Sequence, residues 1–226
     1  MIDDNSRPGN GAVFFMLLTS SHIILLLLLL PQYAATVHLD TAIINSTVYF
    51  NFQLTDESKI SISGNSNVNE FNCLAYQDYA NGNGIVERNS TDQHLKFSQT
   101  NIRILVKSLS CDNQVMDYDM YQALKSDKYP YITLDIKEAY PAGNQNLNLN
   151  NGVDLFVKAE LSLAGIKKMQ LIRIRATTSE QGQLIFRGKH KINLKDFNIE
   201  PPTALFGVIK VKDEVLINFD LIVIVK

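Results

Sequence analysis

The two cysteines, Cys73 and Cys111, are the residues of this chain with the clearest chemistry. They form no Cys-x-x-Cys motif and have no clustered histidines beside them, so their spacing does not indicate a metal site. An even number of cysteines in an exported chain, which the N-terminal segment indicates, favours one disulfide. In the chain-entropy model, closing a loop of this length stabilises a fold by about 4 kcal/mol. The sequence therefore predicts a Cys73–Cys111 disulfide, with two buried free thiols as the alternative.

Catalytic and metal-binding motifs are missing from the rest of the sequence. His22, His38, His94 and His190 are scattered, and none stands at a metal-ligand spacing from another ligand. The chain has no Gly-x-Ser-x-Gly elbow, phosphate-binding glycine loop or dinucleotide fingerprint. We therefore expect neither an enzyme nor a cofactor. The 21 basic and 23 acidic residues are too balanced for nucleic-acid binding.

The N-terminal segment has the composition of an export signal. Residues 12–30 are mostly apolar and end in a leucine run at 25–30, and the small residues Ala34 and Ala35 follow. We expect a signal peptide over residues 1–35 and a periplasmic or secreted protein. The apolar stretch is close to the ~20 residues that cross a bilayer, so an uncleaved membrane anchor is the alternative. Membrane contact is expected only in that case.

Alternation of apolar and polar residues dominates the remaining chain and predicts strands. An Asn-Gly-Asn-Gly sequence at residues 81–84 predicts a hairpin turn, and an Asn-rich stretch at 144–152 predicts a hairpin loop. These features indicate one antiparallel domain, a barrel or sandwich, over residues 36–226. A sheet of about eight strands can remove its edges by closing, which leaves room for one small ligand. The predicted strands are residues 48–54, 60–63, 71–76, 102–107, 131–136, 155–163, 169–177, 183–194, 208–211 and 215–225.

One helix interrupts this pattern, over residues 115–125. Its apolar stripe has helical spacing, and the Tyr-Pro pair at 129–130 is expected to stop it. Packing of the stripe onto the sheet is the favoured interpretation, and contact with a ligand is the alternative, because methionine adapts to irregular surfaces. The stripe consists of Met116, Met120, Ala123 and Leu124.

Three blocks, in this order, resemble the YceI-like family. They are the helix with Tyr129-Pro130, the Leu-x-x-x-Gly-x-x-Lys turn from Leu161 to Lys168, and the segment 196–221. The resemblance extends from about residue 48 to the end, and the cysteine pair indicates a separate branch. It implies an all-β, lipocalin-like antiparallel barrel of about eight strands with one short helix. It also implies binding of a polyisoprenoid or other amphiphilic lipid, and makes a homodimer reasonable.

The leading hypothesis is a non-enzymatic, exported carrier or sequestering protein with an apolar pocket. A solid-core module at the cell surface and a hydrolase or isomerase acting on an amphiphile are the alternatives. The helix would serve as a lid that Cys111 tethers to the strand carrying Cys73. Lys167 and Lys168 are read as a solvated turn, with a lipid head group as the alternative contact. The expected pocket residues are Ile104, Val106, Ile132, Leu134, Leu155, Val157, Leu161, Phe186, Ile217, Phe219 and Leu221.

Overall fold

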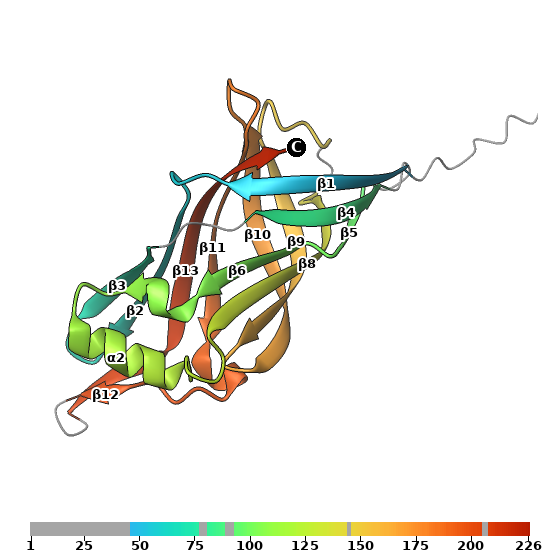
Figure 1. Ribbon diagram of the computed structural model, residues 1–226. Coiled ribbons are helices and arrows are strands. Elements are labelled where there is room, and N and C mark those ends of the chain that lie inside the picture. Colours follow the sequence, from blue (N-terminus) through green and yellow to red (C-terminus); the bar gives the residue numbers. More distant parts are fainter. Residues whose placement is uncertain (1–45, 77–80, 89–92, 144–145, 205–207) are drawn as a thin grey trace, which may run out of the picture. The chain divides into compact units, whose positions relative to one another are not determined.

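The computed structural model describes residues 46–76, 81–88, 93–143, 146–204 and 208–226 (Figure 1). All of them belong to one compact unit, Ala42–Lys226. The predicted signal peptide at 1–35 lies outside the described residues. Within the described ranges, no helix has the length and apolar character that crossing a membrane requires.

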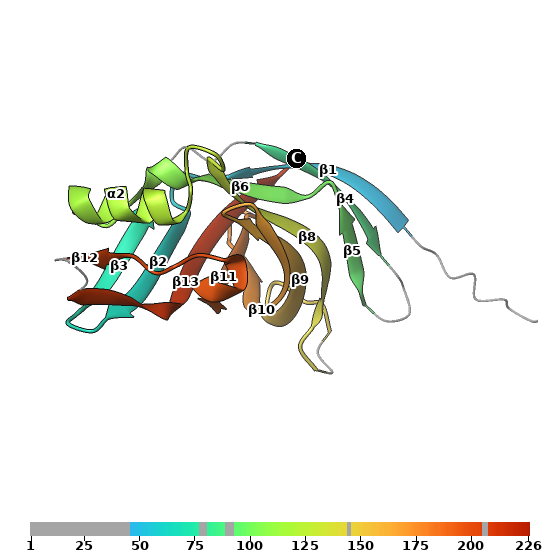
Figure 2. The same cartoon turned by 90° about the horizontal axis from the view of Figure 1, so that it is seen from below.

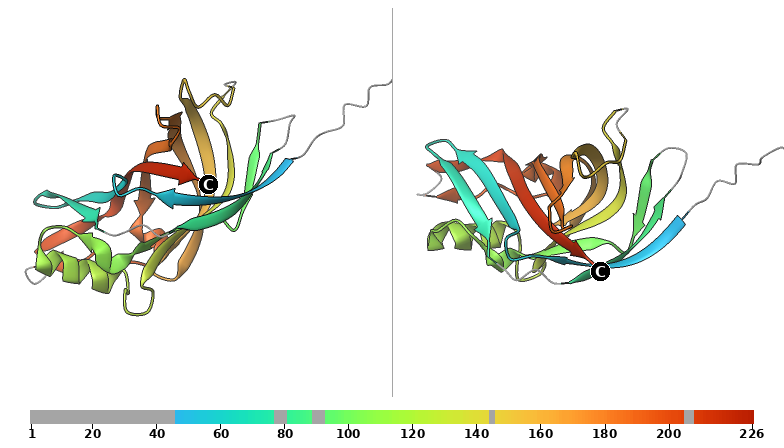
Figure 3. Two further views of the ribbon diagram at one scale, coloured as in Figure 1. Left: turned by 45° about the horizontal axis from the view of Figure 1, so that its top comes forward. Right: turned by 90° about the horizontal axis from the view of Figure 1, so that it is seen from above.

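Eight antiparallel strands form a closed ring within the described chain. The final strand pairs with the first, with Phe52 opposite Val225 and Leu54 opposite Val223, and this contact closes the ring (Figure 3). The predicted antiparallel fold of about eight strands is therefore confirmed. The ring order is β1 (Ser46–Leu54), β4 (Gly82–Arg88), β5 (Leu95–Ser98), β8 (Tyr131–Pro141), β9 (Val153–Leu163), β10 (Ile166–Thr178), β11 (Leu184–Asn193) and β13 (Ile209–Val225).

The remaining elements extend the sheet at one end of the ring. Strands β2 and β3 form a hairpin that pairs with β13, and α2 lies beside this hairpin (Figures 1 and 2). The predicted single helix is confirmed among the described residues. These elements are β2 (Lys59–Ser66), β3 (Glu70–Ala75), β6 (Asn101–Leu105), β7 (Leu109–Ser110), β12 (Thr203–Ala204), α2 (Gln114–Ala123), and the 3-10 turns η1 (Val106–Ser108) and η2 (Leu194–Phe197).

Strand β9 shows how the sequence pattern produces the ring wall. Its alternate residues from Val153 to Leu163 are all buried, and the residues between them are not. It pairs with β10 along its whole length through a tight turn in which Ala164 and Gly165 have positive φ. The Tyr129 ring lies against Gly165, where a Cβ would be 2.6 Å from Tyr129 Cε1. The Tyr-Pro block and the glycine turn, which are far apart in the sequence, therefore pack together.

The predicted hairpin turn at residues 81–84 is wrong. Gly82 and Gly84 lie inside β4, opposite Phe52 and Phe50 of β1, and β4 pairs with β1 and β5 rather than β3. The aromatic ring opposite each glycine covers its α-carbon, and a Cβ on Gly84 would lie 2.6 Å from Phe50 Cζ. Glycine therefore makes room for an aromatic ring in a strand here, instead of providing a turn.

Two other boundaries differ from the prediction. Helix α2 ends at Ala123, before the Tyr-Pro pair, because Lys125 turns the chain with a left-handed φ of 54°. The segments predicted at 208–211 and 215–225 form one long strand, β13, with an irregularity between Val211 and Val215. This length allows β13 to pair with β11, β2, β12 and β1.

Away from α2, side chains fill the ring interior in three hydrophobic clusters. We call these clusters the filled region. Residues from β1, β9, β10, β11 and β13 meet there, and aromatic rings supply much of the volume. Its buried members are Phe52, Leu54, Ile60, Ala139, Val153, Leu155, Val157, Ala159, Ile172, Ala176, Leu221 and Val223.

Candidate functional site

A cavity of about 390 Å³ lies between α2 and the sheet. This volume falls within the range of small-molecule sites in proteins. The sheet side of the cavity is apolar, and most of its residues are buried. We call this part of the molecule the hollow region. Its sheet residues include Ile132, Leu161, Leu163, Ile192, Val215 and Ile217.

Helix α2 forms the opposite wall with its apolar stripe. Met116, Met120, Ala123 and Leu124, the residues that the helical spacing singled out, all line the cavity. Leu124 is buried, whereas the two methionines are only partly buried. The stripe therefore packs against the protein and also presents a flexible apolar surface to the cavity.

Polar residues lie at the edge of the cavity. Asn69 and Ser66 come from the β2–β3 hairpin, Asn113 and Asp119 from α2 and its N-cap, and Thr203 from β12. Asp119 is the ionisable side chain among the described residues that line the cavity. The site is thus an apolar chamber with a mainly uncharged polar rim, which suits an amphiphile better than a polar metabolite.

The disulfide between Cys73 and Cys111 forms part of the cavity wall. Both residues line the cavity, and the bond joins β3 to the segment that leads into α2. The predicted pairing is therefore confirmed, and the described chain contains no free cysteine. Because β3 and β7 share only the pairs Leu74–Ser110 and Ala75–Leu109, the covalent bond reinforces a short stretch of sheet.

Hydrogen bonds donated to Asp117 attach the start of α2 to the same segment. Its carboxylate accepts a bond from the Ser110 hydroxyl at 2.7 Å and one from the Cys111 N–H at 2.6 Å. The Asn113 side chain caps the helix by accepting bonds from the N–H groups of Val115 and Met116. Each of these bonds satisfies a polar group at a helix end or turn.

Tyr121 holds the second half of α2. Its hydroxyl donates a bond to the Leu109 carbonyl at 2.7 Å. Burial raises the pKa of Tyr121, and the Asp117 carboxylate adds to this effect, so the phenol stays protonated as a donor. Lys107 also forms an exposed ion pair with Asp127, beyond the C-terminal end of the helix. The helix is thus attached to the sheet by polar contacts on one side and faces the cavity on the other.

The structure places all of the predicted pocket residues in or against the hydrophobic clusters inside the ring. It does not bring them all to the cavity. Ile132, Leu161 and Ile217 line it, and Val106, Ile104 and Leu134 belong to the cluster around it. The rest lie in the filled region: Leu155, Val157, Phe186, Phe219 and Leu221.

Several cavity residues were not among those predicted. Ile62 and Phe71 come from the β2–β3 hairpin, and Leu194 and Ile199 come from η2 and the residues after it. The alternation at 60–63 places Ile62 on the apolar face, which was the available signal. The irregular chain around η2 carries no such pattern, so its contribution depends on the tertiary fold.

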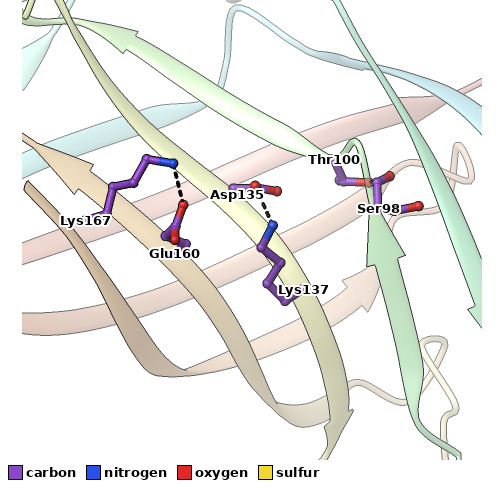
Figure 4. Close-up of polar contacts among 6 residues, drawn as sticks. All are labelled: Ser98, Thr100, Asp135, Lys137, Glu160 and Lys167. Atoms are coloured by element: carbon purple, nitrogen blue, oxygen red, sulfur yellow. Dashed lines mark hydrogen bonds and ion pairs between the residues drawn. The ribbon is translucent and has the colours of Figure 1, made fainter. Parts of the chain in front are cut away.

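The two lysines after the glycine turn have different surroundings. The Lys167 ammonium is 2.8 Å from Glu160 on the outer face of the sheet, near the Asp135–Lys137 pair (Figure 4). This arrangement fits the solvated interpretation. Lys168 stands opposite Leu161, a cavity residue, and so belongs to the inner face. In the described ranges, no group of three or more His, Cys, Asp or Glu residues is placed to hold a metal ion.

Comparison with known proteins gives a family for this arrangement. The YceI-like domain model matches residues 55–223. The crystal structure of BcnA from Burkholderia cenocepacia is similar, with a TM-score of 0.52, 20% identity, and coverage of 74% of this chain and 96% of BcnA. A polyisoprenoid-binding domain from Saccharophagus degradans, implicated in plant cell wall breakdown, has a TM-score of 0.54 and 12% identity, with 79% and 98% coverage. No curated protein is significantly similar to the chain in sequence. The family match covers most of the described fold, and this chain belongs to the YceI-like family.

Proposed function

We propose that this protein is an exported, non-enzymatic carrier or sequestering protein that holds the tail of an isoprenoid or similar amphiphile in the cavity beneath α2. The observation that carries the proposal is the apolar cavity itself, whose walls are mainly leucine, isoleucine, valine and methionine side chains. Burial of a hydrocarbon tail contributes about 0.8 kcal/mol per methylene. A long tail therefore binds well without specific polar contacts.

The lining of the cavity also favours binding over catalysis. Asp119 at the rim is the one ionisable group among the described lining residues, and a single carboxylate supplies no acid/base pair. A solid-core module predicts no large apolar cavity, so the 390 Å³ cavity favours the ligand-binding hypothesis. The structurally similar Saccharophagus domain is described as polyisoprenoid-binding, which agrees with the proposed ligand class.

Export is supported by the disulfide, because such bonds persist in oxidising compartments. The apolar N-terminal segment agrees with this. A periplasmic or secreted location, the homodimer and membrane contact through a retained N-terminal segment remain predictions.

The test is mass spectrometry of lipid extracted from the purified protein, combined with titration of a fluorescent prenyl probe. We expect copurified amphiphile and saturable probe binding. Ala123→Phe fills the cavity from α2 and should weaken probe binding about tenfold or more, since the added ring occupies the space of the tail. Gln122→Phe is the matched control, because Gln122 is exposed on the same helix. Absence of both lipid and probe binding would reject the proposal.

A further inference from the structure

The ladder between β10 and β11 stops halfway along the two strands. It runs from Thr178–Leu184 to Ile174–Gly188 and ends there. Strand β10 remains paired with β9 as far as Ile166, and β11 remains paired with β13 as far as Asn193. The two strands therefore separate toward the β9–β10 turn, below their labels in Figure 1.

The gap between β10 and β11 ends where the residues around η2 pack against the β9–β10 hairpin. Leu194, Phe197 and Ile199, in and just after η2, are buried in one cluster with Leu163 and Ala164 of the β9–β10 hairpin. The apolar contact closes the ring wall below the separation. Residues 168–173 of β10 and 189–191 of β11 thus have no backbone pairing with each other, between the ladder above and the packing below. We call this unpaired stretch the window.

Three polar side chains in this window belong to the inner face of the ring. Lys168 stands opposite Leu161, Gln170 opposite Ala159, and His190 opposite Ile217. Residues directly opposite in an antiparallel pair project to the same face. Leu161 and Ile217 line the cavity, and Ala159 is fully buried. The polar side chains are therefore next to the cavity wall, at positions where an apolar residue is expected.

The window has unused hydrogen-bond donors. His190 Nε2 is 3.0 Å from Gln170 Oε1, and because an amide oxygen only accepts, the ring nitrogen donates. The Gln170 amide nitrogen then has no hydrogen-bond partner among the described residues, so both of its N–H groups can donate to a ligand. Lys168 is exposed and forms no ion pair with the described residues. Lys168 and Gln170 are two residues apart on one strand and so belong to the same face of the sheet.

The charge in the window is positive. Burial lowers the pKa of His190, so its ring is neutral at pH 7 and Lys168 carries the charge. On the outer face of the same strands, Lys167 is paired with Glu160 and Lys191 with Glu214. Each of these two outward lysines therefore has a carboxylate partner, whereas Lys168 has none among the described residues.

We propose that Lys168 and Gln170, with His190 as the residue that positions Gln170, bind an anionic head group, a phosphate or carboxylate, of the amphiphile. This inference rests on the proposed function. The tail would lie against Leu161 and Ile217, each directly across a strand pair from a polar residue of the window. Asp119 repels an anion at the rim beside α2, so the charged end is favoured at the window.

Calorimetric titration with farnesyl phosphate and farnesol tests this assignment, because the two compounds share one tail. We expect the phosphate to bind about tenfold more tightly than the alcohol, as charge-assisted hydrogen bonds require. Lys168→Met should remove most of that difference without changing farnesol binding, and Gln170→Leu should remove a smaller part. His190→Leu should reduce the difference, and His190→Gln, which keeps a donor, should restore it. Lys189→Met is the matched control, since Lys189 is exposed on the outer face beside His190.

Each outcome has a separate meaning. Equal affinity of the wild-type protein for both compounds would overturn the head-group site while leaving the proposed function intact. Failure of both compounds to bind would reject the proposed function and, with it, this inference. Titration with inorganic phosphate distinguishes the source of the anion, and binding of inorganic phosphate with equal affinity for the two farnesyl compounds would assign the window to free phosphate instead.

Discussion

The filled and hollow regions share one ring of strands but are stabilised differently. In the filled region, aromatic rings lie directly on glycines of the neighbouring strand, as Phe52 does on Gly82 and Phe219 on Gly188. The missing side chain lets the ring occupy the interior, so little space remains. The hollow region has one such pair, Phe71 on Gly64, but most of its lining is aliphatic, and a cavity of about 390 Å³ remains beneath α2.

The hollow region has additional attachments around its cavity, besides the packing of its hydrophobic cluster. The disulfide, the Asp117 hydrogen bonds and the Tyr121 hydroxyl bond all attach α2 and its preceding segment to the sheet. These contacts lie around the cavity and need no side chain in its centre. Packing therefore stabilises both regions, and in the hollow region the covalent and polar attachment of α2 adds to the packing of the surrounding cluster.

Reduction of the disulfide should give the largest effect. The bond closes a sequence separation of 38 residues, and the chain-entropy model gives a loss of about 4 kcal/mol in the free energy of unfolding. Urea denaturation with and without reductant measures the loss. Exchange of a bound prenyl probe should become faster, because α2 loses its tether. The Cys73→Ser/Cys111→Ser double variant is the control and should not respond to reductant. Unchanged probe exchange would show that the disulfide does not restrain α2.

Truncation of one residue in each region tests the difference in packing. Leu155→Ala, in the filled region, should lower the free energy of unfolding by about 3 kcal/mol, because Leu155 is 4% exposed and leaves a cavity. Met120→Ala, in the hollow region, should cost about 1 kcal/mol, since a partly buried side chain already borders empty space. Urea unfolding of both variants provides the measurement. Equal losses would contradict the distinction between the regions.

Removal of the Asp117 carboxylate tests the polar attachment of α2. Asp117→Ala leaves the Ser110 hydroxyl and the Cys111 N–H without their acceptor and should cost about 2 kcal/mol. Hydrogen exchange of the α2 amides should accelerate more than exchange of the β9 amides. Asp119→Ala, on the same helix, is the control and should leave α2 exchange nearly unchanged. Uniform acceleration across the protein would indicate a global rather than a local role.

The smallest expected effect concerns pH. Burial lowers the pKa of His190 in the folded state below its usual value of 6.5. The unfolded state then binds the proton more readily, so stability should decrease as the pH falls from about 6.5 toward the folded-state pKa. His190→Gln should remove this contribution. Thermal unfolding between pH 7 and pH 5 measures it, and an identical pH profile for the two proteins would show that His190 is not the group responsible.

The sequence predicts the wall of the ring better than its interior. Strand β9 alternates cleanly, and its buried residues are those that the pattern indicates. The helical stripe beginning at Met116 also lies where its spacing implies. The turn predicted at Gly82 and Gly84 is wrong, because a turn glycine and a strand glycine beneath an aromatic ring have the same local sequence. Only the pairing with β1, more than 25 residues earlier, distinguishes them.

The residues of the candidate site are harder still to predict from the sequence, because their positions depend on tertiary structure. Alternation assigns Ile217 and Leu221 to one face equally, yet one lines the cavity and the other fills the core. The difference arises from where β2 pairs along β13 and where α2 packs against the sheet, which no local pattern encodes. Lys168 is similar, because its inner position follows from pairing with Leu161 rather than from its own polarity.

The long strand β13 also has a consequence for the order of folding. Its last residues pair with β1, with Leu54 opposite Val223, and its earlier residues pair with β2 and β11. The pairs with β1 and β2 join residues far apart in sequence and form slowly, because a long loop must be ordered before any of them is gained. The ring therefore stays open, with the edges of β1, β2 and β11 exposed, until the final segment arrives. Until then, the exposed strand edges can pair with another chain, and only a molecule that covers them protects the nascent chain from self-association.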